Sequence, residues 1–402
     1  MCRNMSESGA GRRSWRRNKC DMIRRLILIL TESCNLRCKY CYVENNTCTK
    51  SMSYDVIDAS LKYFGDNIDP HSPSPCTLEV FGGEPLLYMD KVKYIIENFL
   101  PIWQSNPDNA RLTIFSNATL ADEDFFQYMA QYEFVQFNFS VDGNKECHDS
   151  QRIYPDGSGT YDDVSDKFDI WRKIHGMENI KLPEMSLYVL SPGNIRSHIN
   201  VVEEFLSQGV SAFSTAITRE DIWTNDDLDA YEESIMRTVP IYLKEFPKNG
   251  FINRYLLFPR LEKSLNRNSL CEAGHTLIAV NQVGDIYPCH KFAMSNKYKL
   301  GNVFNGTDKS SYGPMFKNIK IENMDGCGKC EYALSPGCMA QCIASCHEYN
   351  GSIFRPIKSI CRLNKINFDA SSILWDNLYY LPRFQDMINS IVPDAIRKDF
   401  QI

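Results

Sequence analysis

The chain has 402 residues, which is enough for one large domain and a smaller one. Its hydrophobic fraction of 43% is typical of a globular protein, and its net charge of −6 gives no sign of a nucleic-acid-binding protein. The apolar run at residues 26–30 is too short to cross a bilayer. We therefore expect a cytoplasmic protein whose partners include neither nucleic acid nor a membrane.

Residues 1–21 are rich in arginine, and an apolar run follows them. That combination superficially suggests a secretory signal, but no small-residue cleavage site follows and the next segment is rich in cysteine. We expect residues 1–21 to be a disordered basic leader, too short to fold as an independent module.

From residue 22 to about residue 230, short apolar runs alternate with longer segments of helical character. This alternation predicts an α/β fold of βαβ units with a parallel sheet, and six such units make an open, partial (β/α)6 barrel of the TIM type. The expected strands lie at residues 22–30, 76–81, 111–115, 134–140, 183–190 and 210–215. The expected helices lie near residues 53–64, 90–99, 122–131, 161–174 and 195–207. A further helix is expected within residues 220–248.

Three cysteines, Cys34, Cys38 and Cys41, directly follow the first expected strand. A four-iron cluster normally takes a thiolate on every iron, so a loop that offers three leaves one iron open for chemistry. The cysteines alone would also fit a zinc site that lacks one ligand. Their spacing, with Tyr40 before the last one, resembles the motif of the radical S-adenosylmethionine (SAM) enzymes. The resemblance implies that the free iron binds SAM and that Tyr40 is among the cofactor-binding residues. Reductive cleavage of SAM yields a 5′-deoxyadenosyl radical.

The string Gly82-Gly83-Glu84 closes the second expected strand. Two glycines allow a close approach of the backbone, and Glu84 supplies a carboxylate suited to an ammonium group. The string resembles the glycine–glycine–glutamate–proline motif of the same family, which implies that it binds the amino group of the cofactor.

Polar residues also end the later strands, where a barrel enzyme keeps its ligand contacts. The resemblance implies that four of them contact SAM: Asn117, Ser140, Asp142 and Arg152. One departure is Ala118, where relatives often have glycine, and this puts the role of Asn117 in doubt.

Eight of the sixteen cysteines lie between Cys271 and Cys361, and residues 277–287 predict a hairpin with a glycine turn. An isolated Cys-x-x-Cys pair would favour zinc, but seven or eight thiolates exceed one tetrahedral site and fit two four-iron clusters. The spacing resembles the SPASM extension of radical SAM enzymes, which holds two auxiliary clusters. We therefore expect three [4Fe–4S] clusters in all.

The resemblance also implies the ligands of the auxiliary clusters. The second cluster would have Cys327, Cys330, Cys338 and Cys361, and the first would have Cys271, Cys289 and Cys342. The fourth ligand of the first cluster is either Cys346 or absent. Seven residues separate Cys330 from Cys338 where the usual pattern has five, so the register of Cys338, Cys342 and Cys346 stays open.

These patterns divide the chain into consecutive parts. After the leader we expect a radical SAM partial barrel at residues 22–230, a helical linker at 231–270, a SPASM domain with a β-hairpin and short helices at 271–362, and a C-terminal helical segment at 363–402.

The resemblance points to a peptide or protein substrate, with two competing activities. One is the joining of a cysteine sulfur to a carbon atom in a ribosomally made precursor peptide, which gives a thioether. The other is the oxidation of serine or cysteine to formylglycine, whose enzymes carry an aspartate where this chain has His290. A neutral imidazole can also accept a proton, so His290 is a candidate base.

A reductant such as flavodoxin or ferredoxin is an expected partner. The leader of the precursor peptide is expected to bind either to another surface of this chain or to a separate leader-binding protein. A non-enzymatic alternative is an iron–sulfur electron carrier or sensor. Such a protein would need the clusters but not Glu84, Ser140 and Asp142 around a ligand.

Overall fold

The structure is a computed structural model that describes residues 22–43, 49–69, 72, 75–176, 187–207, 209, 212–219, 222–257, 271–308, 312–317, 319–334 and 342–391. The predicted leader at residues 1–21 and the candidate ligand Cys338 lie outside these residues. So do the end of the predicted linker, residues 258–270, and the end of the C-terminal segment, residues 392–402.

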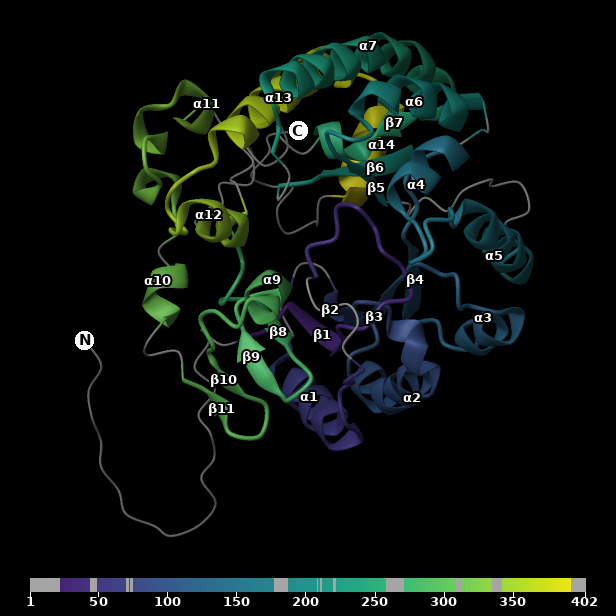
Figure 1. The fold of residues 1–402 in the computed structure, drawn as a ribbon, viewed down its shortest axis with the longest axis vertical. Helices are drawn as coiled ribbons and strands as arrows, with labels where there is room; N and C mark the ends of the chain where they lie inside the picture. The colour runs from purple at the N-terminus through teal and green to yellow at the C-terminus, as the bar shows by residue number, and fades with distance from the viewer. Residues whose placement is uncertain are drawn as a thin grey trace.

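Parallel strands form the predicted partial barrel, with helices around its outside (Figure 1). The strands are β1 (Arg25–Thr31), β2 (Cys76–Gly82), β3 (Ala110–Ser116), β4 (Val135–Phe139), β5 (Leu187–Leu190), β6 (Ala212–Ile217) and β7 (Ile252–Asn253). Strands β1 to β4 are parallel neighbours in one sheet, and β5 to β7 are parallel neighbours in another. The predicted α/β fold class is confirmed, and β7 is a short addition that the sequence analysis missed.

The helices between these strands are close to the predicted ones. They are α1 (Tyr54–Asn67), η1 (Pro85–Tyr88), α2 (Met89–Ser105), α3 (Glu123–Met129), α4 (Lys145–Gln151), α5 (Tyr161–Ile174), η2 (Ile195–Ser197), α6 (His198–Ser207) and α7 (Asn225–Asn249). Helix α4 was not predicted, because its seven residues are mostly polar and show no apolar periodicity.

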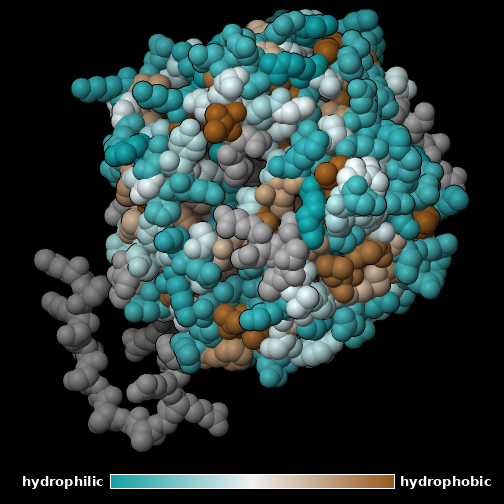
Figure 2. Space-filling model, viewed as in Figure 1, coloured by the Kyte–Doolittle hydropathy of each residue, from teal (hydrophilic) through white to brown (hydrophobic). Residues whose placement is uncertain are grey.

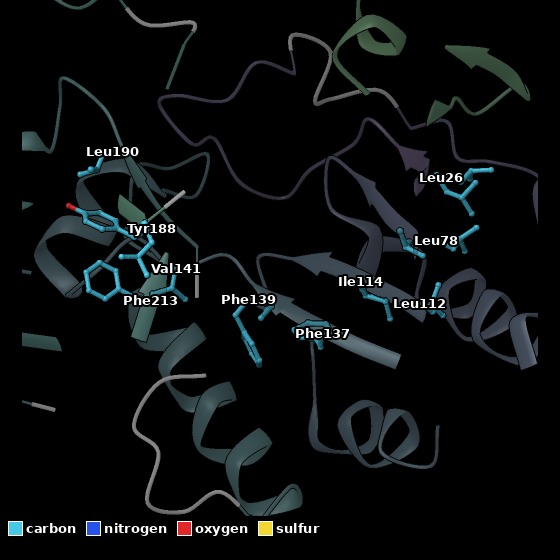
Figure 3. Packing of buried hydrophobic residues seen from close by; sticks show 14 of the residues in the cluster. Leu26, Leu78, Leu112, Ile114, Phe137, Phe139, Val141, Tyr188, Leu190 and Phe213 are labelled. Carbon is cyan, nitrogen blue, oxygen red and sulfur yellow. The ribbon is translucent and has the colours of Figure 1, made fainter. Parts of the chain in front are cut away.

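Strand β1 packs against two hydrophobic cores, because successive side chains of a strand point to opposite faces. Leu26, Leu28 and Leu30 are buried in the core of the barrel. Ile27 and Ile29 are buried in a second core that includes residues of the cysteine-rich part. Figure 3 shows the barrel core running from Leu26 through the neighbouring strands to Phe213.

The cysteine-rich part contains the predicted hairpin and several short helices. Its elements are β8 (Leu277–Val280), β9 (Asp285–Tyr287), α9 (His290–Met294), β10 (Gly301–Asn302), β11 (Gly306–Thr307), α10 (Gly313–Lys317), η4 (Ile321–Asn323), η5 (Cys327–Lys329), α11 (Glu331–Leu334) and α12 (Ile343–Asn350). Strand β8 pairs in parallel with β1, with Leu26 opposite Ile278 and Leu28 opposite Val280. The hairpin therefore extends the barrel sheet, which the sequence pattern did not reveal.

The remaining elements are η3 (Arg254–Leu257), α13 (Lys358–Leu378) and α14 (Pro382–Ile391). Helix α13 packs along α7 (Figure 1), and the buried hydroxyl of Tyr231 donates a 2.8 Å hydrogen bond to Asn367 Oδ1 between them. The face shown in Figure 2 is mostly hydrophilic, with separate small hydrophobic patches. In the described part of the chain, no helix combines the length and apolar character needed to cross a membrane.

Shortening Ile29 should destabilise the barrel and the cysteine-rich part together. Ile29→Ala removes buried atoms where the two parts share β1, so we expect a loss of about 2–4 kcal/mol in the free energy of unfolding. The midpoint of denaturant unfolding measures it. Ile222→Ala, at a side chain that is 73% exposed, is the control and should change the stability by less than about 0.5 kcal/mol. Equal effects of the two variants would contradict this view of the shared strand.

Candidate cofactor and metal site

The cysteine loop leaves the carboxyl end of β1 and lies along residues 151–153. The backbone N–H of Arg37 donates to the carbonyl of Ile153 (2.7 Å), and that of Lys39 donates to the carbonyl of Gln151 (2.9 Å). These two bonds fix the loop beside Arg152, although more than a hundred residues separate the two segments in the sequence.

The three thiols of the loop suit a cluster rather than a single ion. Cys34 and Cys38 are half-buried, and Cys41 is exposed. Burial raises the pKa of Cys34 to about 12 and that of Cys38 to about 11, so both thiols are protonated until a metal replaces the proton. Among the described residues no three potential ligands converge on one point as a mononuclear site requires. A four-iron cluster has no such requirement, because each thiolate binds a different iron.

Gly82 and Gly83 allow two strand ends to come into main-chain contact. A Cβ on Gly82 would lie 2.1 Å from the carbonyl oxygen of Thr31, and one on Gly83 would lie 2.0 Å from that of Ser33. Gly82 also has φ = 145°, a backbone conformation that other residues rarely adopt. The two glycines thus let the backbone at the end of β2 approach the start of the cysteine loop.

Glu84 is a buried carboxylate, only 1% exposed, at the end of β2. Its Oε1 accepts hydrogen bonds from Leu86 N (2.9 Å) and Ser116 Oγ (2.8 Å), and its Oε2 accepts one from Asn117 N (2.8 Å). Burial raises the pKa of Glu84 to about 7, and these donors limit the rise. In the described part of the chain Glu84 forms no ion pair, so it can take up a cationic or amino ligand.

Asn117 joins the end of β3 to the cysteine loop. Its Nδ2 donates to Asn35 Oδ1 (2.9 Å), and its Oδ1 accepts from the hydroxyl of Thr119 (2.8 Å). Ala118 has φ = 62°, the left-handed conformation that favours glycine. The alanine therefore keeps the backbone shape that glycine would give at this position.

Asp142 forms the most densely bonded group of the site. It is fully buried, and its carboxylate accepts hydrogen bonds from the hydroxyl of Tyr40, from Arg152 Nε (2.9 Å) and from Val189 N (3.1 Å). The guanidinium of Arg152 also lies over the ring of Tyr40, 5.4 Å from its centre. Burial would lower the pKa of Arg152, but the Asp142 and Tyr40 charges raise it overall, so the arginine stays charged.

Two residues that the sequence analysis proposed as cofactor contacts, Ser140 and Tyr40, make contacts within the protein. Ser140 lies next to the site, and its backbone N–H donates to the carbonyl of Ser116 (3.0 Å). Tyr40 bonds to Asp142 through its hydroxyl, so it supports the Asp142–Arg152 pair. The sequence analysis missed His148 and Thr160, which lie fully buried behind that pair. The only signal for His148 was its place four residues before Arg152.

Comparison with known proteins identifies one domain of the chain. Residues 28–206 match the Radical SAM superfamily. The chain contains a radical SAM domain. A cysteine-type anaerobic sulfatase-maturating enzyme of Clostridium novyi (strain NT) is 24% identical over 326 residues, 74% of this chain and 80% of that protein. Mycofactocin maturase MftC of Mycolicibacterium smegmatis is 24% identical over 332 residues, 77% of this chain and 76% of that protein.

Solved structures share the fold of the radical SAM domain and its extension. The structure of anSMEcpe with bound AdoMet has a TM-score of 0.69 at 18% identity and covers 94% of this chain and 98% of its own. Streptococcus suis SuiB bound to precursor peptide SuiA has a TM-score of 0.55 at 16% identity and covers 83% of this chain and 75% of its own. The family implies SAM and one [4Fe–4S] cluster, and the three-cysteine loop and Glu84 fit them.

Outside the radical SAM domain, Cys271, Cys289 and Cys342 gather at the base of the β8–β9 hairpin and the start of α12. Burial is the largest cause that raises the pKa of Cys289, and the charges of Cys342 and Cys271 raise it further, so the three sulfurs are neighbours. Burial would also raise the pKa of Cys342, but Lys291 and Arg219 lower it overall. Positive charge therefore favours a thiolate at Cys342.

The other four candidate ligands in the described residues are Cys327, Cys330, Cys346 and Cys361. Cys327 and Cys330 flank one turn, with Cys330 N bonded to the carbonyl of Cys327 (3.0 Å). Cys346 is fully buried one helical turn after Cys342. Burial raises its pKa to about 12, with smaller contributions from Cys342 and Cys361. The thiol of Cys346 is thus close enough to Cys342 and to Cys361 for their charges to act on it, and its assignment to one of the two expected auxiliary clusters stays a prediction.

His290 lies between the radical SAM domain and the hairpin. Its ring centre is 5.2 Å from that of Phe81 on β2 and 5.8 Å from that of Tyr42. Within the described residues, its buried Nδ1 has no hydrogen-bond partner. The imidazole is therefore available as a proton acceptor at the junction of the two parts.

Replacing Glu84 should weaken SAM binding without loss of iron. Glu84→Gln keeps the shape but removes the negative charge, so we expect the dissociation constant for SAM to rise about tenfold or more. Equilibrium dialysis with the reconstituted protein measures it. Glu79→Gln is the control, because Glu79 is also buried on β2 but bonds to Arg25 (2.8 Å). An unchanged dissociation constant for Glu84→Gln would show that this carboxylate does not contact the cofactor.

Proposed function

We propose that the protein is a radical SAM peptide maturase with two auxiliary clusters, which installs cysteine-derived thioether crosslinks in a precursor peptide. The observation that carries the proposal is the position of Tyr42. Burial raises the pKa of Tyr42, and the charges of Cys41, Cys289 and Cys342 raise it further, so this phenol is near thiols of both the cysteine loop and the cysteine-rich part. An electron carrier would have no use for the buried Glu84 and Asp142–Arg152 groups beside the first of them.

A cavity at this junction is large enough for a peptide side chain. It has a volume of about 470 Å³ and is lined by residues from the cysteine loop, α9 and α12, including Tyr42, Val43, Lys291, Ala344 and His347. Lys291 Nζ lies 4.9 Å from the centre of the Tyr42 ring and donates to Ser345 Oγ (3.1 Å). In this proposal a substrate cysteine enters the cavity, where Lys291 favours its thiolate.

The crosslinking reaction oxidises the peptide, which loses two hydrogen atoms in total. Bound SAM and the clusters would supply the hydrogen-abstracting radical and take up the second electron. A hydrogen atom leaves the acceptor carbon, the thiol loses a proton, and the sulfur–carbon bond forms. In this proposal the chain's own residues bind the cofactor through Glu84 and Arg152 and stabilise the substrate thiolate through Lys291.

Formylglycine formation is the second candidate, because curated relatives include sulfatase-maturating enzymes. This chain has His290 where the resemblance leads us to expect an aspartate base. Within the described residues His290 Nδ1 has no hydrogen-bond partner, and in this second candidate it takes the place of that carboxylate. The nature of the product distinguishes the two activities.

The reconstituted protein should bind about twelve irons in three four-iron clusters. Changing Cys34, Cys38 and Cys41 together to alanine should remove about a third of the iron. The matched control changes Cys76 and Cys147, buried thiols outside all three sites, and should lose none. Iron and zinc are measured by elemental analysis of protein prepared without oxygen. Zinc in the cysteine-rich part, or iron for one cluster only, would contradict the auxiliary clusters.

A treated precursor peptide should lose two hydrogens, and the crosslinked cysteine should resist alkylation. Mass spectrometry of a cysteine-containing candidate peptide, before and after thiol alkylation, measures both changes. Formylglycine on a sulfatase-derived peptide, with loss of that activity in His290→Ala, would instead support the second candidate. Either product supports a peptide maturase, and only the first supports thioether formation.

A further inference from the structure

His148 on α4 links the two residues that form the buried ion pair of the cofactor site. Its Nδ1 accepts a hydrogen bond from the backbone N–H of Asp142 (3.2 Å). A neutral imidazole that accepts at Nδ1 carries its proton on Nε2, which lies 2.9 Å from Thr160 Oγ1. The hydroxyl of Thr160 in turn donates to the carbonyl of Arg152 (3.1 Å).

The relay runs in one direction, from the main chain of Asp142 through His148 and Thr160 to the main chain of Arg152. Each member is buried: His148, Thr160 and Asp142 have no exposed surface, and Arg152 is 8% exposed. Burial lowers the pKa of His148 to about 3, with smaller contributions from Arg152 and Lys145, so the imidazole stays neutral. A neutral ring is required here, because a protonated one could not accept from Asp142 N.

Both ends of the relay fix residues that also bond to each other. Arg152 Nε donates to Asp142 Oδ2 (2.9 Å), and its Nη2 lies 3.4 Å from Asp142 Oδ1. In the described residues Nη1 makes no hydrogen bond, and this leaves a donor for a carboxylate ligand. The direction of that donor depends on the backbone of Arg152, which the relay holds.

We propose that His148 is a positioning residue of the radical SAM cofactor site, which acts through Thr160 to orient Arg152 toward the carboxylate of the ligand. This inference rests on SAM being bound beside Glu84 and Arg152. His148 touches neither the cofactor nor the cysteines in this proposal. Its loss should therefore weaken SAM binding while the iron of the cluster is retained.

Thr160 offers a sharper test than His148, because it can be changed without loss of volume. Thr160→Val removes the hydroxyl that connects His148 to Arg152, and Thr160→Ser keeps it. We expect the dissociation constant for SAM to rise about tenfold in Thr160→Val and less than about twofold in Thr160→Ser, as is usual for supporting hydrogen bonds. His148→Asn, which keeps an acceptor near the Nδ1 position but loses the Nε2 donor, should behave like Thr160→Val.

A second buried histidine provides the matched control. His198 is fully buried and its Nδ1 lies 3.0 Å from Ser234 Oγ, between α6 and α7. Ser234→Ala removes a comparable histidine–hydroxyl bond far along the chain from the cofactor site. It should lower the unfolding midpoint about as much as Thr160→Val and leave the dissociation constant for SAM unchanged.

The experiment is equilibrium dialysis of SAM against each reconstituted protein, with iron content and unfolding midpoint measured in parallel. A selective loss of SAM affinity in Thr160→Val and His148→Asn, restored in Thr160→Ser, supports the proposal. Wild-type affinity in Thr160→Val, or an equal loss in Ser234→Ala, overturns it and leaves the proposed function intact. A wild-type protein with full iron that binds no SAM overturns both.

Discussion

The site depends on a main-chain contact between the ends of β1 and β2. Gly82 and Gly83 lie so close to the carbonyls of Thr31 and Ser33 that no side chain could be accommodated there. Backbone hydrogen bonds from Gly83 N to Thr31 O (2.8 Å) and from Glu84 N to Ser33 O (2.7 Å) hold the contact. It sets the distance between the first cysteine of the loop and the carboxylate of Glu84. A cluster on the cysteine loop and a cofactor held by Glu84 would therefore share one main-chain support.

The two buried carboxylates of the site, Asp142 and Glu84, have different roles because their bonding partners differ. Asp142 is neutralised within the protein by Arg152 and fixed by Tyr40 and Val189 N, so it is a structural centre. Among the described residues Glu84 accepts hydrogen bonds from neutral donors only, and a buried carboxylate without a cation in direct contact is costly. An amino group of a ligand would supply that partner. A cofactor bound there through its amino group would complete this electrostatic arrangement.

The sequence was informative where a short motif specifies both the local backbone and the reactive side chains. The cysteine loop, Glu84 and the parallel strands were predictable because spacing and periodicity encode them. The pairing of β8 with β1 was not predictable, because both strands are apolar and the sequence of β8 does not specify which strand it pairs with. His148 and Thr160 were missed for a related reason: their role consists of hydrogen bonds to main-chain atoms, which any residue could provide. At Ala118 the sequence was misleading in the opposite way. The change from glycine to alanine suggested a different backbone, but Ala118 keeps the left-handed conformation that glycine favours.

The most direct test of this account is the reductive cleavage of SAM. Protein reconstituted without oxygen is supplied with SAM and a strong reductant, and 5′-deoxyadenosine and methionine are quantified by chromatography. The account expects both products in equal amounts from the wild-type protein, and neither from the variant in which Cys34, Cys38 and Cys41 are alanine, although that variant keeps its remaining iron. A wild-type protein with its full complement of iron that forms no 5′-deoxyadenosine would contradict the central claim.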